Sequence, residues 1–201
     1  MVPRHLKITM AVLAIAVAGL SIYVFRLKGL AEENVRRTSD TRPVTPPQVG
    51  PSERVRLIIA YDEDVALRAR EVEVPLPAEQ AERARELLRA LIMEYAHKPS
   101  PHPLAEGADV REVFLVPVPG GYMAVVDVNA AFADGHRSGV LVEDLTLASV
   151  IETLAANVAG VLKVKLLVNG AERETLAGHS DLTGFYEVSA VREAHHDRTI
   201  E

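Results

Sequence analysis

The sequence contains no cysteine and no tryptophan, and aromatic residues make up only 4% of its 201 residues. The absence of cysteine excludes disulfide bonds, zinc sites built on thiolates, a cysteine nucleophile and lipid attachment to an N-terminal cysteine. The scarcity of aromatic residues is unfavourable for a sugar-binding groove with an aromatic lining. Catalytic motifs are missing too, since the chain has no H-E-x-x-H, phosphate-binding glycine loop, G-x-G-x-x-G or G-x-S-x-G. The sequence therefore offers no recognised catalytic signature.

Charge is unevenly divided along the chain. Up to Ser52 there are 7 Lys and Arg residues against 3 Asp and Glu, whereas from Glu53 onward there are 15 against 25, a balance of −10. Such an acidic region is unfavourable for binding nucleic acid or anionic membrane surfaces, because like charges repel. We therefore expect no nucleic-acid partner.

Residues 8–25 form an uncharged apolar run of eighteen residues, preceded by a short tail of residues 1–7. At about 1.5 Å per residue, a helix of this length just crosses a hydrocarbon core of about 30 Å, so we predict a single transmembrane anchor. The alternative is a signal peptide cleaved after Ala16-Val17-Ala18, although the apolar run continues beyond that point. More Lys and Arg residues follow the run than precede it, which by the positive-inside rule favours a cytoplasmic C-terminal part.

The rest of the chain divides into a linker, a folded domain and a tail. Residues 26–52 are predicted to form a flexible linker, because they are rich in proline and charge and contain few apolar residues. A folded domain is predicted over residues 53–190. Residues 191–201 are predicted to form a disordered tail.

Apolar periodicity within the domain predicts both strands and helices. Alternating apolar residues are typical of strands, and apolar residues spaced by three and four are typical of helices. Pro77 fits the first position of a helix, and the charged residues of that helix are predicted to face solvent. The expected elements are strands over 55–61 and 67–76, a helix over 77–95, a proline-containing loop over 97–109, and hairpin strands over 113–117 and 122–128.

The stretch from Leu145 to Leu182 carries the clearest pattern in the domain. Its first part predicts a helix that ends at Gly160, because glycine readily adopts the left-handed conformation that stops a helix. A strand over 164–168, a type I′ turn at Asn169-Gly170 and a return strand over 172–176 are predicted to follow. The helix residues expected on the solvent side are Thr146, Ser149, Glu152, Thr153 and Asn157, while Glu143 and Asp144 are expected in the first turn.

Two amphipathic helices each need an apolar surface to cover. We therefore predict an α+β domain in which both helices pack on one face of a mixed sheet of three to five strands. The other face of this sheet is expected to be partly exposed.

Two groups of polar loop residues are candidates for metal binding. Asp62, Glu63 and Asp64 lack the alternating spacing and the bend glycine of a calcium loop, so a solvated turn is expected. His97 and His102 lie in a loop with no third ligand at metal-binding spacing. We expect no metal site in either place.

The best enzymatic constellation in the sequence is His179 with Asp181, with Glu174 nearby, which a pocket would have to convert into an acid–base pair. We expect instead that His179, next to Gly178, stabilises a tight turn. In the predicted tail, His195, His196 and Asp197 are expected to be solvated rather than to chelate a metal. The sequence thus predicts no catalytic, cofactor-binding or metal-binding residues.

Several segments share a pattern with a known family. They are the opening strand VRLIIAYD, the helix segment ARELLRALI, and AEGADVREVFL followed by a glycine turn and MAVVDVNAAF. With these segments, residues 54–186 resemble a GerMN domain, the module of GerM-type sporulation and germination proteins. Two positions depart from the family, Lys98-Pro99 where Gly-Pro is common and Asn169 where an acidic residue is common. The most specific matches are Val161, Val164, Leu167, Val168, Asn169, Gly170, Glu174, Gly178, His179 and Asp181.

The resemblance implies a fold like that of ring-building modules in envelope complexes, and no catalytic activity. We therefore expect a non-enzymatic scaffold or assembly component of a bacterial cell-envelope complex of the sporulation or germination type. Other envelope proteins, or further copies of the chain, are the expected partners, and no cofactor is expected. The expected location is the cytoplasmic membrane, crossed once, with the C-terminal domain outside the cytoplasm. The alternatives are a module that binds an envelope ligand such as peptidoglycan, and a hydrolase that uses His179 and Asp181.

Overall fold

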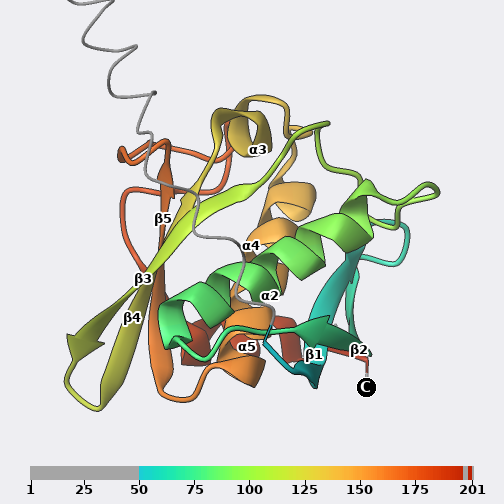
Figure 1. Ribbon diagram of the computed structural model, residues 1–201. Coiled ribbons are helices and arrows are strands. Elements are labelled where there is room, and N and C mark those ends of the chain that lie inside the picture. Colours follow the sequence, from blue (N-terminus) through green and yellow to red (C-terminus); the bar gives the residue numbers. More distant parts are fainter. Residues whose placement is uncertain (1–49, 197–198, 201) are drawn as a thin grey trace, which may run out of the picture. The chain divides into compact units, whose positions relative to one another are not determined.

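The computed structural model describes residues 50–196 and 199–200, which form an α+β domain (Figure 1). The predicted N-terminal tail (residues 1–7), the predicted membrane anchor (residues 8–25) and all but the last residues of the predicted linker lie outside the described residues. Within the described ranges, no helix is long and apolar enough to cross a bilayer. The strands are β1 (Ser52–Tyr61), β2 (Ala66–Pro75), β3 (Val110–Val118), β4 (Gly121–Val128), β5 (Val161–Val168), β6 (Tyr186–Glu187) and β7 (Thr199–Ile200), and the helices are α2 (Gln80–Ala96), α3 (Ala130–Asp134), α4 (Val140–Asn157) and α5 (Val188–His195).

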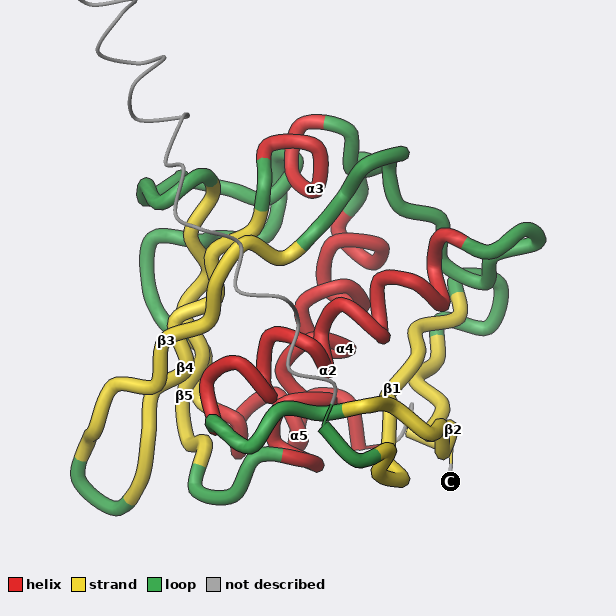
Figure 2. The backbone as a smooth tube through the Cα atoms, in the orientation of Figure 1, coloured by secondary structure: helices red, strands yellow, loops and turns green. Residues whose placement is uncertain are grey.

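The strands form two sheets, so the predicted single sheet is wrong. β1, β2 and β7 form one sheet, and β3, β4, β5 and β6 form the other. Helices α2 and α4 lie between the sheets (Figure 2), with α2 in contact with β1 and β3, and α4 in contact with β1 and β5. The helices therefore bury their apolar residues against two sheets. Fully buried side chains of this core include Leu57, Leu88 and Ile151, and burying each contributes roughly 1.5–3 kcal/mol.

Polar side chains of α4 close the free edge of β1, which keeps the two sheets separate. Ser149, Thr153 and Asn157 are spaced four residues apart and share one side of α4. The Ile58 amide donates to the Thr153 hydroxyl (2.9 Å), and the Ser149 hydroxyl donates to the Ile58 carbonyl (2.5 Å). Asn157 exchanges two hydrogen bonds with the backbone of Arg56 (3.0 and 2.8 Å). The prediction that these helix residues face solvent is wrong, because they satisfy backbone groups that no described strand reaches.

The second sheet combines a hairpin with a parallel crossover. β3 and β4 form the predicted antiparallel hairpin around Pro119-Gly120, and β5 pairs parallel with β4. A parallel pair needs a long connection, which α3 and α4 provide. The turn at Asn169-Gly170 also forms as predicted, with φ of 52° and 75°, the positive values that a type I′ turn requires.

The chain beyond this turn differs from the prediction. Of residues 171–176, only Ala171 pairs with β5, and residues 172–176 form no return strand. Leu176 is fully buried in the core. The prediction of a disordered tail is wrong for residues 191–195, because they belong to α5, which is in contact with α4 and β5; residues 197, 198 and 201 lie outside the described residues. The end of the described chain, β7, pairs with β2.

Candidate functional site

Glu143, in the first turn of α4, is fully buried and forms the centre of a first polar cluster. Its Oε1 accepts hydrogen bonds from the Gly139 amide (3.2 Å) and from His179 Nδ1 (3.0 Å). Its Oε2 accepts from the backbone amides of Ala177 (3.0 Å), His179 (3.0 Å) and Ser180 (2.9 Å). Glu143 thus connects the loop of residues 177–180 to the start of α4.

The hydrogen bonds determine the charge of Glu143. Burial by itself raises the pKa of this carboxyl, but the donors outweigh that effect and lower the pKa to about 2, with the Ser180 amide and the His179 ring contributing most. The carboxylate is therefore ionised at neutral pH and its lone pairs are occupied by donors. An acid of this kind holds a fold together and has no proton to transfer near neutral pH.

The structure does not bring His179 and Asp181 together as an acid–base pair. The His179 ring faces Glu143, whereas the Asp181 carboxylate accepts from the amide and the hydroxyl of Thr183 (both 2.7 Å). Glu174 is exposed, and its backbone carbonyl accepts from the Leu182 amide (2.9 Å). The role that we predicted for His179, holding a turn, agrees with these contacts, and the partner that sequence reasoning missed is Glu143.

His102 and Thr146 are the centre of a second polar cluster and are 0% and 1% exposed. His102 Nδ1 lies 2.6 Å from Asp62 Oδ1, and His102 Nε2 lies 2.6 Å from Thr146 Oγ1. The same hydroxyl lies 2.7 Å from His136 Nε2, and Asp62 also forms an ion pair with Arg137. These contacts tie the turn after β1 and two loops to α4. The predicted solvated turn is thus wrong for Asp62, whereas Glu63 and Asp64 are exposed as predicted. The prediction that Thr146 lies on the solvent side of its helix is wrong.

This second cluster has the residue types of a hydrolase triad but not its accessibility. Burial lowers the pKa of both His102 and His136, and Asp62 only partly offsets this for His102. The Thr146 hydroxyl is engaged by both imidazoles and by the Val142 carbonyl (2.9 Å) inside the domain. A nucleophile must reach a bound substrate, and Thr146 is 1% exposed in this structure.

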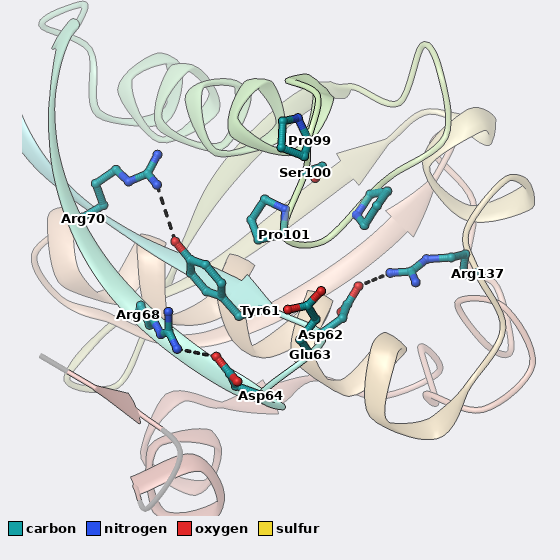
Figure 3. Close-up of a pocket in the computed structure, with 11 residues that line it drawn as sticks. Tyr61, Asp62, Glu63, Asp64, Arg68, Arg70, Pro99, Ser100, Pro101 and Arg137 are labelled. Carbon is teal, nitrogen blue, oxygen red and sulfur yellow. Dashed lines mark hydrogen bonds and ion pairs between the residues drawn. The ribbon is translucent and has the colours of Figure 1, made fainter.

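A cavity of about 620 Å³ lies beside the second cluster (Figure 3). Arg68 pairs with Asp64 across its wall, and Arg137 pairs with Asp62. The third arginine of the lining, Arg70, pairs with a glutamate of α2 and lies 3.5 Å from the Tyr61 hydroxyl. Each arginine of the lining thus has an acidic partner.

The remaining histidine candidates have separate partners. His97 Nδ1 faces the Met93 carbonyl of its own helix (2.6 Å). His195 is buried in α5, and its Nε2 lies 3.4 Å from the Asp144 carboxylate. Asp197 lies outside the described residues. Among the residues that the structure describes, no three His, Asp or Glu side chains are grouped so as to hold a metal ion.

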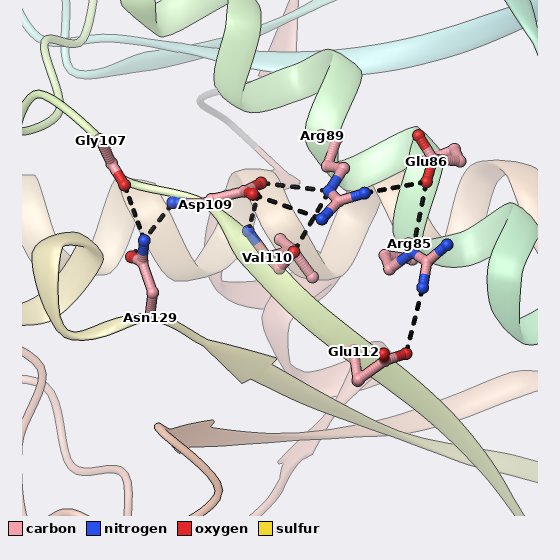
Figure 4. Close-up of polar contacts among 8 residues, drawn as sticks. All are labelled: Arg85, Glu86, Arg89, Gly107, Asp109, Val110, Glu112 and Asn129. Carbon is pink, nitrogen blue, oxygen red and sulfur yellow. Dashed lines mark hydrogen bonds and ion pairs between the residues drawn. The ribbon is translucent and has the colours of Figure 1, made fainter. Parts of the chain in front are cut away.

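Arginines of α2 connect this helix to β3 and to Asp109, just before β3 (Figure 4). We predicted that these arginines face solvent. Arg85 donates to Glu112 (3.2 Å), and Arg89 donates to Asp109 (3.2 and 3.3 Å) and to the Val110 carbonyl (3.2 Å). Partly exposed pairs of this kind contribute little energy each, but they fix how α2 lies on β3. They are structural contacts, like the two buried clusters.

Solved structures that are similar to this chain include structures of two proteins. The tandem GerMN domains of the sporulation protein GerM from Bacillus subtilis are 21% identical, with a TM-score of 0.48 over 66% of this chain and 44% of that chain. A candidate lipoprotein from Clostridium perfringens is 17% identical, with a TM-score of 0.47 over 76% of this chain and 95% of that one. The first GerMN domain of the same Bacillus subtilis GerM is 18% identical, with a TM-score of 0.45 over 66% and 94%. This chain thus spans less than half of the tandem-domain structure.

No curated protein sequence matches the chain significantly. The family model Germane, described as sporulation and spore germination, matches residues 58–174, which is more than half of the 201 residues. The matched range includes α2, the β3–β4 hairpin, α4 and β5. The chain therefore belongs to the Germane family of sporulation and spore germination, in agreement with the predicted GerMN-type domain.

Proposed function

We propose that this chain is a non-enzymatic assembly module of a bacterial cell envelope, held at the cytoplasmic membrane by residues 8–25 with its domain outside. The polar clusters support a non-enzymatic role, because their central groups, Glu143, His102 and Thr146, are buried and occupied by protein partners. We therefore expect the domain to act through its surface. The proposal thus depends on which part of the surface can bind a protein.

The outer face of the β3–β4–β5 sheet is the observation that carries the proposal. Side chains alternate along a strand, and in β3 and β4 the residues toward the helices, such as Val113, Ala124 and Val126, are buried. The residues between them face outward, and of these Phe114 is 53% exposed and Val116 is 39% exposed. The outward residues are Phe114 and Val116 of β3, Met123 and Val125 of β4, and Lys163 and Lys165 of β5.

This outer face has an apolar patch of the kind found in protein-binding surfaces. The patch is formed by β3 and β4. On β5, Lys163 contacts the exposed ring of Phe185 and pairs with Glu187, while Lys165 pairs with Glu172. Exposed apolar patches with a polar rim are typical of protein interfaces. The partner that fits is a protein with an apolar patch, rather than a sugar polymer.

Isolation of tagged full-length chain from membranes tests this proposal. Phe114→Asp places a charge in the apolar patch and should remove co-purifying envelope proteins, whereas Met93→Asp, at a 57% exposed position on α2, should retain them. Equal recovery of partners with both variants would contradict the proposed surface. Retention of the wild-type chain on purified peptidoglycan, unaffected by Phe114→Asp, would favour the ligand-binding alternative.

The proposed location at the membrane has its own test, because it does not depend on which face of the domain binds a protein. A C-terminal alkaline phosphatase fusion is active only outside the cytoplasm, so an active fusion is expected. Deletion of residues 8–25 should abolish that activity and the membrane attachment. An inactive full-length fusion would place the domain in the cytoplasm, as the positive-inside rule indicates.

A further inference from the structure

The two sheets differ in how their free edges are protected. The edge of β1 is filled by the side chains of Thr153 and Asn157, which pair its backbone groups. β3 is an edge strand too, but the contacts from α2 reach only as far as Glu112. From residue 113 to 118, no described side chain hydrogen-bonds the backbone of β3. An unprotected edge is a template for pairing with another strand.

The hairpin determines which backbone groups of β3 point outward. Val118 and Gly121 flank a two-residue turn and begin the ladder, so this pair exchanges both hydrogen bonds. Along an antiparallel ladder, pairs that exchange both hydrogen bonds alternate with pairs that exchange none. The residues of the second kind of pair direct their N–H and C=O groups away from the partner strand. The outward residues of β3 are therefore Val113, Leu115 and Pro117. Pro117 has no N–H, and its outward position leaves the pairing with β4 intact.

We propose that β3 pairs antiparallel with β3 of a second copy of this chain, about a two-fold axis at Phe114. In this register Val113 lies opposite Leu115 of the second copy, and Leu115 lies opposite its Val113. Each of these pairs exchanges two hydrogen bonds through the outward backbone groups. The two Phe114 rings then meet on the outer face as an aromatic cross-strand pair. This inference rests on the proposed assembly function and identifies one of its contacts.

The self-complementarity of β3 favours a second copy over an unrelated strand. Val113 and Leu115 both lie on the face of the sheet that packs against the helices. In the proposed register each therefore lies opposite a residue of the second copy that is on the same face. No like charges are opposed, because Glu112 lies opposite Val116, and Arg111 lies opposite Pro117. A two-fold contact is also closed after two copies, and it leaves neither β3 edge open to further pairing.

Cysteine cross-linking of the full-length chain in membranes tests the register, since the natural sequence has no cysteine. In Phe114→Cys the two thiols would face each other across a non-hydrogen-bonded pair, where the Cα atoms are about 4.5 Å apart and a disulfide can form. Mild oxidation should therefore convert this variant to a covalent dimer. The matched control is Met93→Cys, which is similarly exposed but lies on α2, and it should remain monomeric.

A second variant measures pairing without a disulfide. Phe114→Lys places two ammonium groups opposite each other, so the detergent-solubilised chain should lose its dimer by light scattering while it keeps the circular dichroism spectrum of the wild type. Three results would each overturn the proposal: equal cross-linking of the two cysteine variants, a wild-type chain that is monomeric, and capture of a different protein at position 114. Capture of a different protein would leave the assembly function standing, whereas recovery of no partner at all would remove both.

Discussion

Replacement of Glu143 by glutamine gives the sharpest prediction for the fold. Gln has the shape of Glu but no charge, and its amide nitrogen is a donor. If the side-chain oxygen of the new glutamine accepts from the backbone amides of residues 177, 179 and 180, its NH2 group must face the Gly139 amide. Both of these groups are donors, so they cannot form a hydrogen bond with each other. At least one buried contact then becomes unfavourable, and the remaining hydrogen bonds lose the assistance of charge.

The pKa of Glu143 gives the magnitude. The native contacts lower this pKa from 4.5 to about 2, and at about 1.4 kcal/mol for each pKa unit this corresponds to about 3 kcal/mol of stability near neutral pH. We therefore expect Glu143→Gln to lower the free energy of unfolding by about 3 kcal/mol. This contribution is fully present above pH 4.5 and is lost as the pH falls toward 2. The difference between variant and wild type should therefore shrink over that range.

Urea denaturation of the full-length chain, followed by circular dichroism at pH 7 and at several acidic pH values, measures this effect. Glu82→Gln is the matched control, because Glu82 is an exposed acid in the first turn of α2. Its replacement should change stability by less than about 0.5 kcal/mol. A Glu143→Gln variant as stable as this control, or a difference that does not depend on pH, would refute the reasoning.

Three further replacements test the other contacts. Thr153→Val keeps the side-chain shape but leaves the Ile58 amide without its acceptor, so thermal or urea unfolding should show a loss of about 1–3 kcal/mol. His102→Ala removes the contacts to Asp62 and Thr146 and should lower the free energy of unfolding by about 2–4 kcal/mol. Because burial lowers the pKa of His102, the stability of the wild type should decrease more steeply than that of the variant as the pH is lowered from 6.5. His179→Ala loses one partly exposed contact to Glu143 and should lower stability by about 1 kcal/mol without another effect, so a stable variant that fails to recover partner proteins would support the site interpretation instead.

The local elements of the fold could be predicted from sequence because their signals are local. The apolar spacing that predicts α4, the Pro119-Gly120 hairpin and the Asn169-Gly170 turn all depend on residues close together in the chain. The pairing of strands into two sheets could not be predicted in this way, since apolar periodicity does not say which strands are neighbours. The predicted helix boundaries were accordingly more accurate than the predicted sheet.

The buried polar contacts were missed for the same reason. Glu143 is expected in the first turn of α4, yet its partners Ala177, His179 and Ser180 lie 34 to 37 residues further along the chain. His102 and Thr146 are 44 residues apart, and Thr153 meets Ile58 across 95 residues. One signal was available, because short polar side chains repeated every four residues on an otherwise apolar helix are typical of a buried polar stripe. We interpreted that stripe as a solvent face.

The most direct test of the account is photo-cross-linking in living cells, with a photo-reactive phenylalanine analogue in place of Phe114 in the full-length chain. The account predicts covalent adducts with protein at this position, and none when the same analogue replaces Met93, which is equally exposed on the opposite side of α2 from the core. Absence of adducts at position 114, or equal adducts at both positions, would contradict the claim that this chain works through the outer face of its β3–β4–β5 sheet.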